Sequence, residues 1–384
     1  MAEKTTVFST RRRHRGVDWW FGVGDDLQKR RLTAQHLLDR EHSSVVDVAR
    51  SQLATQAQDF HGATWALALR SASTVSDVGI ALENGSVVRT WPMRGTLMMT
   101  AADDARWLTE LLAPRSFQAS AGVWRQTGLD EQHFARAADI ARDTLGGGRV
   151  ASRTTLLAAF DTGGVDTSTG RGSHLLRRLA GECVIVFAAP RGTEQTFALL
   201  DEWAPGARQL TRESSLAELA IRYVAGHGPA TVHDLAWWSG LTVADARRAV
   251  TLAGDAIAEA EIAGVTSLVA EDAHPTVVES PRVHLLPPFD ELLLGYRDRT
   301  ASLDPRHKDA VVPSSNGLFL ATVTVDGRVV GTWRRTLTGS GDGGVAVNVT
   351  ALPGESALVA SEAVQRQLAH RSAEYAAFLG RRLA

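Results

Sequence analysis

Two glutamines one residue apart, Gln56 and Gln58, stand at the end of a segment with helical periodicity. Residues i and i+2 lie almost opposite each other on an α-helix, so a continuing helix would leave one of the two amides in solvent. If the backbone stops being helical there, both amides can converge. Two amide carbonyls could then accept hydrogen bonds from one water molecule and present partial negative charge to a developing cation, without any titratable base.

A structural explanation of the same pair stays open at this point. Gln56 would bond a loop carbonyl and Gln58 would be solvated, and the spacing taken alone favours this explanation. The catalytic alternative requires the helix to end or unwind at Gln56–Asp59, before the helix that follows Gly62. The elements around the pair therefore decide whether it can do chemistry.

Three helical segments and a hairpin surround the pair. The first helix is capped by Thr33, the second starts at a Ser44 cap, and the third is "ATWALALRS" at 63–71. Strand-like runs then flank Asn84-Gly85, a dipeptide that favours a two-residue hairpin turn. Three helices followed by a β-hairpin is the element order of a winged helix.

This order recurs twice further along the chain. Helical segments from residue 131 lead to a recognition-type helix in "GRGSHLLRRLAGE", a strand, a turn at Pro190–Gly192 and a returning strand, and a third copy starts near residue 215. The stretch "GPATVHDLAWWSGLTVADARRAV" at 228–250 carries a Thr cap, a Gly turn and a second Thr cap. It is the most specific helix-turn-helix signal in the sequence.

The sequence pattern changes after residue 281. Prolines, a dipeptide that favours a hairpin turn at Asp326-Gly327, and a terminal helix follow. Within "PPFDELL", we expect Asp290 to cap a turn. The sequence therefore predicts a mixed α+β fold of three tandem winged-helix units and a small β-barrel-like C-terminal module. The predicted divisions are an N-terminal arm at 1–29, winged helices at 30–125, 126–212 and 213–280, and the β-rich module with its terminal helix at 281–384.

Composition narrows the class of protein. Cys183 is the single cysteine, which excludes an internal disulfide and a cysteine-rich zinc site and suits a reducing cytoplasm. No apolar run is long enough for a membrane span, and the basic N-terminus lacks the apolar region of a secretory signal. There is no P-loop, Rossmann fingerprint or metal-ligand spacing. We therefore expect a cytoplasmic protein that needs no cofactor and no metal.

The net charge of −2 means that any nucleic-acid binding must come from local patches. For any single arginine a solvated surface is the simpler interpretation. On a chain with three candidate winged helices, binding of the DNA phosphates by a basic hairpin is a competing interpretation of clustered arginines. Two basic patches are candidates for phosphate binding. The first contains Arg297, Arg299, Arg306 and Lys308, and the second contains Arg328, Arg334 and Arg335.

Five stretches together resemble the AlkZ/YcaQ-type DNA glycosylases, a bacterial tandem winged-helix family, from about residue 30 onward. They are "LATQAQDF", "RTWPMRGTLMM", "GPATVHDLAWWSGL", "HLLPPFDELLLGYRDR" and "DGRVVGTWRR". The resemblance implies that the Gln-apolar-Gln motif, Gln56-Ala57-Gln58, carries catalysis; YcaQ-like members have Gln-x-Asp, so the match favours the AlkZ side. One departure is that Met98 and Met99 follow "RGTL" where a histidine is expected, which puts the substrate range in question.

With the resemblance, we expect a monofunctional glycosylase that hydrolyses the N-glycosidic bond of N7-alkylated, cationic purines, bulky ones included. Its partner would be double-stranded DNA carrying alkylated bases, it would act as a monomer, and it could protect a host from its own alkylating metabolite. Gln56 and Gln58 are the expected catalytic residues. The expected DNA-binding residues are Arg94, Thr96, Arg297, Arg299, Arg328, Arg334 and Arg335.

Two other functions compete with this expectation. A non-enzymatic winged-helix DNA-binding protein or transcriptional regulator is the first, because a fold does not fix a function. A scaffold whose winged helices bind protein is the second. Three nonidentical copies in one chain, and no evident effector domain, argue against the regulator.

Overall fold

The computed structural model describes residues 27–38, 44–271, 281–313, 317–339 and 343–384. Most of the predicted N-terminal arm therefore lies outside the described residues. Its last three residues belong to helix α1 (Leu27–Ala34), which starts earlier than predicted. Thr33 lies inside α1, where its hydroxyl donates to the Lys29 carbonyl (3.0 Å), and so it is not the cap of that helix.

An order of three helices followed by a hairpin occurs three times. The first unit has α2 (Val45–Gln52), α3 (Phe60–Ser71), α4 (Val75–Glu83), β2 (Val87–Met93) and β3 (Thr96–Ala101). The second has α6 (Glu131–Leu145), α7 (Arg153–Thr162), α8 (Arg171–Gly181), β5 (Ile185–Arg191) and β6 (Glu194–Leu199). The third has α10 (Arg212–His227), α11 (Val232–Ser239), α12 (Val243–Ala253), β7 (Ile257–Ile262) and β8 (Val265–Ala270). Helix α5 (Ala102–Gln126) joins the first unit to the second, and the short α9 (Leu200–Trp203) follows β6.

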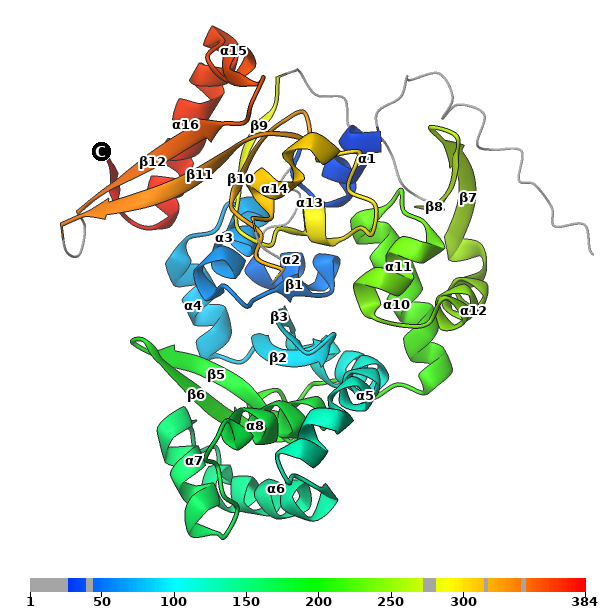
Figure 1. The fold of residues 1–384 in the computed structure, drawn as a ribbon, viewed down its shortest axis with the longest axis vertical. Helices are drawn as coiled ribbons and strands as arrows, with labels where there is room; N and C mark the ends of the chain where they lie inside the picture. Colours follow the sequence, from blue (N-terminus) through cyan, green and yellow to red (C-terminus); the bar gives the residue numbers. More distant parts are fainter. Residues whose placement is uncertain (1–26, 39–43, 272–280, 314–316, 340–342) are drawn as a thin grey trace, which may run out of the picture.

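A short extended segment follows the first helix of each unit and pairs with the second strand of that unit's hairpin. Strand β1 (Thr55–Gln56) pairs with β3, β4 (Ala151–Ser152) pairs with β6, and Ala230 bridges to Leu268 in β8. The first two hairpins join through β2 and β5 into one sheet of order β1-β3-β2-β5-β6-β4. The first unit lies at the centre of Figure 1, with the second below it and the third to its right.

The capping pattern predicted for the third unit is confirmed. The Thr231 side chain caps α11 in a reciprocal capping box with Asp234, and Gly240, at φ +75°, ends that helix. Thr242 then caps α12 by accepting the backbone N–H of Asp245. These caps satisfy backbone N–H groups that would otherwise lack partners at the start of each helix.

The turn of the first hairpin was predicted at the wrong dipeptide. Asn84 ends α4 instead, and Gly85 follows it with φ +73°. The true turn between β2 and β3 is Arg94-Gly95, with φ values of +52° and +66°, as a two-residue turn with two positive φ angles requires. The left-handed backbone that Asn-Gly favours also suits the end of a helix, so the local signal was ambiguous.

The C-terminal module is a five-stranded sheet of order β13-β12-β11-β10-β9. Its strands are β9 (Val283–Leu286), β10 (Thr322–Val325), β11 (Arg328–Thr338), β12 (Gly344–Ala351) and β13 (Arg382–Leu383). The edge strands β9 and β13 do not pair with each other among the described residues, so this sheet is open and the predicted β-barrel-like module is not confirmed. The predicted turn at Asp326-Gly327 is confirmed, with positive φ at both residues.

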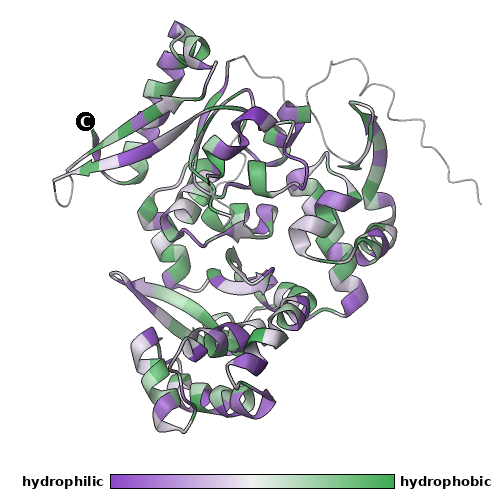
Figure 2. Cartoon of the chain, viewed as in Figure 1, coloured by the Kyte–Doolittle hydropathy of each residue, from purple (hydrophilic) through white to green (hydrophobic). Residues whose placement is uncertain are grey.

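Helix α16 (Glu362–Phe378) covers this sheet and links it to the first unit. Tyr375 of α16 makes edge-to-face ring contacts with Trp65 of α3 and Trp333 of β11, each at 5.0 Å between ring centroids. Residues of α2, α3, β9, β10 and α16 share one hydrophobic core. Figure 2 shows that β11 and β12 carry hydrophobic and hydrophilic residues along their length, and the distal half of β11 is largely exposed. No helix in the described ranges is long and apolar enough to cross a membrane.

His284 of β9 should make folding stability depend on pH. Its ring is buried, Nε2–H donates to the Leu37 carbonyl (2.8 Å), and burial lowers its pKa from 6.5 to about 4. Below about pH 6.5 His284 binds a proton in the unfolded chain but stays neutral in the folded chain. The free energy of unfolding therefore falls as the pH drops toward 4. A shift of this size corresponds to about 3 kcal/mol.

The check is urea unfolding of the wild type and of His284→Gln near neutral pH and at about pH 5. The wild type should lose more stability between the two conditions than the variant does, because glutamine does not titrate. Equal losses in both proteins would show that His284 does not cause the pH dependence.

Candidate active site

The backbone around the two glutamines is not helical: Thr55–Gln56 form a short strand, and Gln58 lies at a bend. Helix α2 ends at Gln52, four residues before the predicted boundary, because Leu53 takes a positive φ of +63°. Gln56 then lies in β1, and Gln58 directly precedes Asp59, the N-cap residue of α3. Because this backbone is not helical, it removes the opposition that a continuing helix would impose on the two side chains.

Hydrogen bonds fix the position of Gln56. Its backbone N–H donates to Oε1 of Glu291 (3.4 Å), and its side-chain Oε1 accepts the backbone N–H of Gln58 (3.2 Å). Gln56 is 7% exposed, whereas Gln58 is exposed to solvent. A carbonyl oxygen has two acceptor positions, so Oε1 of Gln56 retains one for a water molecule.

Glu291, which sequence reasoning did not select, is the residue that links Gln56 to the third unit. Its carboxylate is buried in α13 (Glu291–Leu294), where Oε2 accepts the indole N–H of Trp238 (2.9 Å) and lies 3.4 Å from Nε2 of His227. The His227 ring stacks on Tyr223 at 4.7 Å. The available signal was an acidic residue inside the apolar run "PPFDELLL", since a buried carboxylate needs partners.

The preceding acid faces the first unit. Both oxygens of Asp290 accept hydrogen bonds from Arg70 of α3, each at 3.0 Å, and both side chains are 2% exposed. Asp290 also accepts the backbone N–H of Leu292, so the predicted turn cap is confirmed. Asp290 and Glu291 thus tie α3, β1 and α11 to one short segment.

Two of the predicted DNA-binding arginines meet on one indole ring. The guanidinium carbons of Arg94 and Arg299 lie 4.9 and 4.7 Å from the ring centroid of Trp237. Burial lowers the pKa of Arg94, and burial followed by the nearby Arg94 charge lowers the pKa of Arg299. Within the part of the chain that the structure describes, Nε of Arg94 is buried without a hydrogen-bond partner. Arg94 and Arg299 therefore place two positive charges beside α11, the helix that carries Trp237 and Trp238.

The remaining predicted DNA-binding residues are spread over the molecule. Thr96 begins β3 and is partly exposed, and Arg297 is exposed beside Arg299. On β11, Arg334 is exposed, and Arg335 donates to the Tyr375 hydroxyl (2.9 Å). Arg328 starts the same strand and, at about 3.3 Å per residue, lies roughly 20 Å from Arg334. The structure does not bring Arg328 together with the other two.

The position where the resemblance implies a histidine is next to Gln56. Met98 of β3 is paired with Gln56 of β1, and Met99 with Thr55. Directly paired residues on neighbouring antiparallel strands place their side chains on the same face. Met98 is completely buried, so this site holds a thioether where an imidazole could have made hydrogen bonds.

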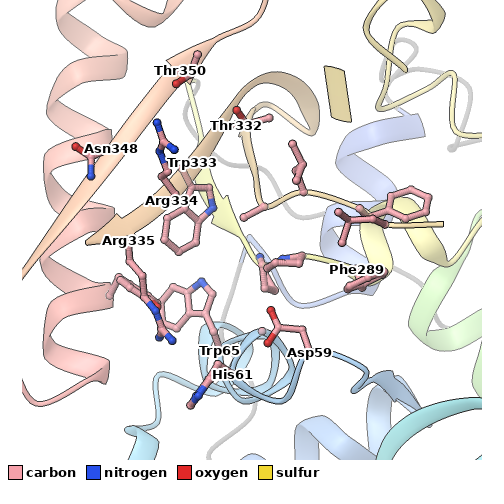
Figure 3. Close-up of a pocket in the computed structure, with 18 residues that line it drawn as sticks. Asp59, His61, Trp65, Phe289, Thr332, Trp333, Arg334, Arg335, Asn348 and Thr350 are labelled. Carbon is pink, nitrogen blue, oxygen red and sulfur yellow. The ribbon is translucent and has the colours of Figure 1, made fainter. Parts of the chain in front are cut away.

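A cavity of about 760 Å³ lies beside the glutamine segment, between the start of α3, the loop at 287–289 and the strands β11 and β12. Figure 3 shows Asp59 and His61 at one end of this cavity and Thr332 and Thr350 at the other. Asp59 is the residue directly after Gln58, although neither glutamine lines the cavity. Arg334 and Arg335 line it, so part of the predicted basic hairpin faces this space.

Comparisons with known proteins agree with this architecture. A curated protein of Streptomyces sahachiroi, an interstrand DNA cross-link repair glycosylase, is 28% identical over 324 residues, which cover 79% of this chain and 85% of that protein. The solved structure of the Streptomyces sahachiroi DNA glycosylase AlkZ matches with a TM-score of 0.75 at 24% identity, covering 94% of this chain and 98% of the other. The family described as DNA glycosylase AlkZ-like matches residues 49–378. The chain therefore belongs to the AlkZ-like DNA glycosylase family.

Proposed function

We propose that this protein is a monofunctional DNA glycosylase that hydrolyses the N-glycosidic bond of N7-alkylated, cationic purines. The observation that carries the proposal is the placement of Gln56 and Gln58 on nonhelical backbone, with the Gln56 N–H bound to the buried Glu291. Family membership supports the reaction class. We further propose that the three helix–hairpin units are winged helices with the divisions 30–125, 126–212 and 213–280, followed by the module at 281–384.

The chemistry follows from the charge of the substrate. A purine alkylated at N7 carries a positive charge, so its bond to C1′ breaks without protonation of the leaving base. The protein then has to hold a water near C1′ and stabilise an oxocarbenium-like sugar. The amide carbonyls of Gln56 and Gln58 accept the hydrogens of that water and direct partial negative charge toward the cation, which is positioning combined with electrostatic preorganisation.

Neutral amides suit this location better than a carboxylate base. Gln56 is almost fully buried, and an ionised carboxylate there would have to be desolvated beside the buried Glu291. Neither of the two amides can protonate a neutral leaving base such as uracil. The proposed site therefore favours N7-alkylated purines. These bases are cationic in the DNA and become neutral when the bond to C1′ breaks.

An interstrand cross-link between two N7 atoms presents the same chemistry at each end, because each linked purine is an N7-alkylated cation. The curated relative is named for the repair of interstrand DNA cross-links. We propose that this chain acts on cross-linked as well as singly alkylated purines. It would do so as a monomer on double-stranded DNA in the cytoplasm, without a cofactor or metal.

The test is release of free base from duplexes that carry 7-methylguanine or uracil. The purified protein should release 7-methylguanine, leave an abasic site with an intact strand, and leave uracil in place. Failure to release any alkylated base would favour the non-enzymatic DNA-binding protein. A selection from random duplexes distinguishes that alternative, since a regulator would return one strong consensus sequence.

We place DNA contacts at Arg94, Thr96, Arg297, Arg299, Arg328, Arg334 and Arg335. The double change Arg334→Ala with Arg335→Ala should weaken binding to any duplex and reduce the slope of log K against log salt by about 2, because each lost phosphate contact releases one counterion fewer. Binding is measured by fluorescence anisotropy from low to moderate salt.

The matched control is Arg142→Ala, which removes an exposed arginine of α6 that is paired with Asp139. This control should leave the slope unchanged. A double variant with the wild-type slope would remove the β11 arginines from the DNA-binding surface.

A further inference from the structure

Arg89 of β2 is a buried arginine in direct contact with the glutamine segment. It is 6% exposed, and its Nε–H donates to the carbonyl of Ala57 (3.1 Å), the residue between Gln56 and Gln58. In the six-stranded sheet β3 lies between β1 and β2 (Figure 1). The Arg89 side chain therefore spans β3 to reach this carbonyl.

Aromatic rings, and not a carboxylate, surround the Arg89 guanidinium. Its central carbon lies 4.8 Å from the ring centroid of Phe187 and 5.7 Å from that of Phe60. Within the described ranges no carboxylate forms an ion pair with it, and burial lowers the pKa of Arg89 to about 10. A buried cation without a counter-charge costs free energy, whereas an apolar side chain of similar length would fill the same space at less cost. Packing alone therefore does not account for an arginine at this position.

The hydrogen bond from Arg89 acts on the peptide group that orients the Gln56 amide. The carbonyl of Ala57 and the N–H of Gln58 belong to one planar peptide group. Arg89 binds its carbonyl end, and Oε1 of Gln56 accepts its N–H (3.2 Å). Because the guanidinium is charged, its hydrogen bond polarises this peptide group and strengthens the N–H as a donor. A continuous chain of hydrogen bonds therefore runs from Arg89 to the Gln56 side chain.

This chain of hydrogen bonds determines which end of the Gln56 amide faces the Gln58 N–H. A side-chain amide has a carbonyl that accepts and an NH₂ that donates. The Gln58 N–H can bond only the carbonyl end, so it fixes the direction of the remaining acceptor position of Oε1. A misplacement of about 1 Å in a catalytic site can cost about 10²-fold in rate.

We propose that Arg89 is a positioning residue of the catalytic site, which holds the peptide group between Ala57 and Gln58 and thereby orients the Gln56 amide toward the attacking water. The inference rests on the proposed function, because it takes Gln56 as a catalytic residue. Arg89 acts through the peptide group and does not itself contact the water. The structural alternative is that Arg89 only satisfies a buried carbonyl, in which case its loss would act independently of Gln56.

Two substitutions of matched length separate the hydrogen bond from packing. Arg89→Gln places an amide N–H the same number of bonds from the backbone as the arginine Nε–H, whereas Arg89→Met places a methyl group there. The measurement is single-turnover release of 7-methylguanine at increasing protein concentration. Arg89→Met should lower the maximal rate by about tenfold or more and change the half-saturating concentration by less than about twofold. Arg89→Gln should recover most of the lost rate.

The matched control is Arg178→Met in α8. The Arg178 side chain is 12% exposed, and its guanidinium carbon lies 4.7 Å from the ring centroid of Phe117, so the change also removes a largely buried arginine from an aromatic ring. This control should keep the wild-type maximal rate. A wild-type rate in Arg89→Met, or equal slowing by Arg89→Met and Arg89→Gln, would overturn the proposal.

A double-variant comparison tests whether Arg89 acts through Gln56. In the Gln56→Ala protein the orienting hydrogen bond has no acceptor, so adding Arg89→Met should slow release by less than about twofold further. A further loss of about tenfold or more in that background would show that Arg89 acts independently of Gln56, and would support the structural alternative instead.

Hydrogen exchange separates this proposal from the proposed function. If the wild type releases no base, the glycosylase assignment fails while the positioning contact can still be tested. Exchange of the Gln58 N–H with solvent reports its bond to Gln56 and is followed by NMR on protein with isotope-labelled glutamine. The signal is assigned by its absence in Gln58→Ala. Arg89→Met should speed this exchange by about tenfold or more, and Arg178→Met should not change it. Unchanged exchange in Arg89→Met would overturn the positioning role whatever the activity of the protein.

Discussion

Replacing Gln56 or Gln58 by alanine is expected to slow release of 7-methylguanine from duplex DNA by on the order of 10²-fold each, by analogy with the loss of one oxyanion-hole donor. Each change removes an amide carbonyl that we assign to the attacking water. The backbone contact to Glu291 survives in both variants, because it uses the N–H of Gln56. Gln58→Ala also keeps the hydrogen bond from its own N–H to Gln56 Oε1, so it isolates the lost amide most cleanly.

The pattern across variants distinguishes catalysis from folding. Binding to lesion-bearing DNA should persist in both single variants, because the glutamines act on the water and the sugar. The double variant should lose less than the product of the two single effects, since both amides act on one water. Gln132→Ala, at an exposed position of α6, is the control and should keep the wild-type rate. Undiminished excision in both single variants would move the active site elsewhere.

Asp290→Ala is expected to destabilise the fold by about 3–5 kcal/mol, the range measured when one partner of a buried ion pair is removed. The change would leave the Arg70 guanidinium, 2% exposed, without its bidentate carboxylate. It would also remove the cap on the Leu292 N–H. Urea unfolding measures the loss.

Two further variants test the cause of that loss. Asp139→Ala breaks an ion pair with Arg142 in which both side chains are more than half exposed, and it should cost less than about 1 kcal/mol. Arg70→Met combined with Asp290→Ala should recover part of the loss, because no unpaired charge stays buried. A small effect of Asp290→Ala, similar to that of Asp139→Ala, would contradict the assignment of this pair as a structural tie.

Local signals in the sequence were sufficient for part of the fold. The caps at Thr231 and Thr242 and the turn at Asp326-Gly327 depend on contacts within a few residues, and all were predicted correctly. Asn84-Gly85 is also local, but its backbone preference fits a helix end as well as a hairpin. The open C-terminal sheet depends on pairings between strands far apart in the sequence, which no local pattern specifies.

In the candidate site too, local features could be predicted from the sequence and contacts between distant segments could not. The nonhelical backbone at Gln56–Gln58 was inferred from the sequence, although α2 ends earlier than expected. The link from Gln56 to Glu291 spans 235 positions of the chain, so periodicity and capping rules could not reveal it. Sequence also could not separate Arg94 and Arg299, which converge on Trp237, from Arg328, which lies apart from Arg334 on the same strand.

The catalytic role of Gln56 and Gln58 is tested by single-turnover excision from matched duplexes carrying 7-methylguanine or uracil, with wild type and with the Gln56→Ala/Gln58→Ala double variant. We expect wild type to release 7-methylguanine and to leave uracil in place. The double variant should bind the 7-methylguanine duplex but release the base at least about 10²-fold more slowly. Release of 7-methylguanine by the double variant at the wild-type rate, or efficient release of uracil by wild type, would contradict this role.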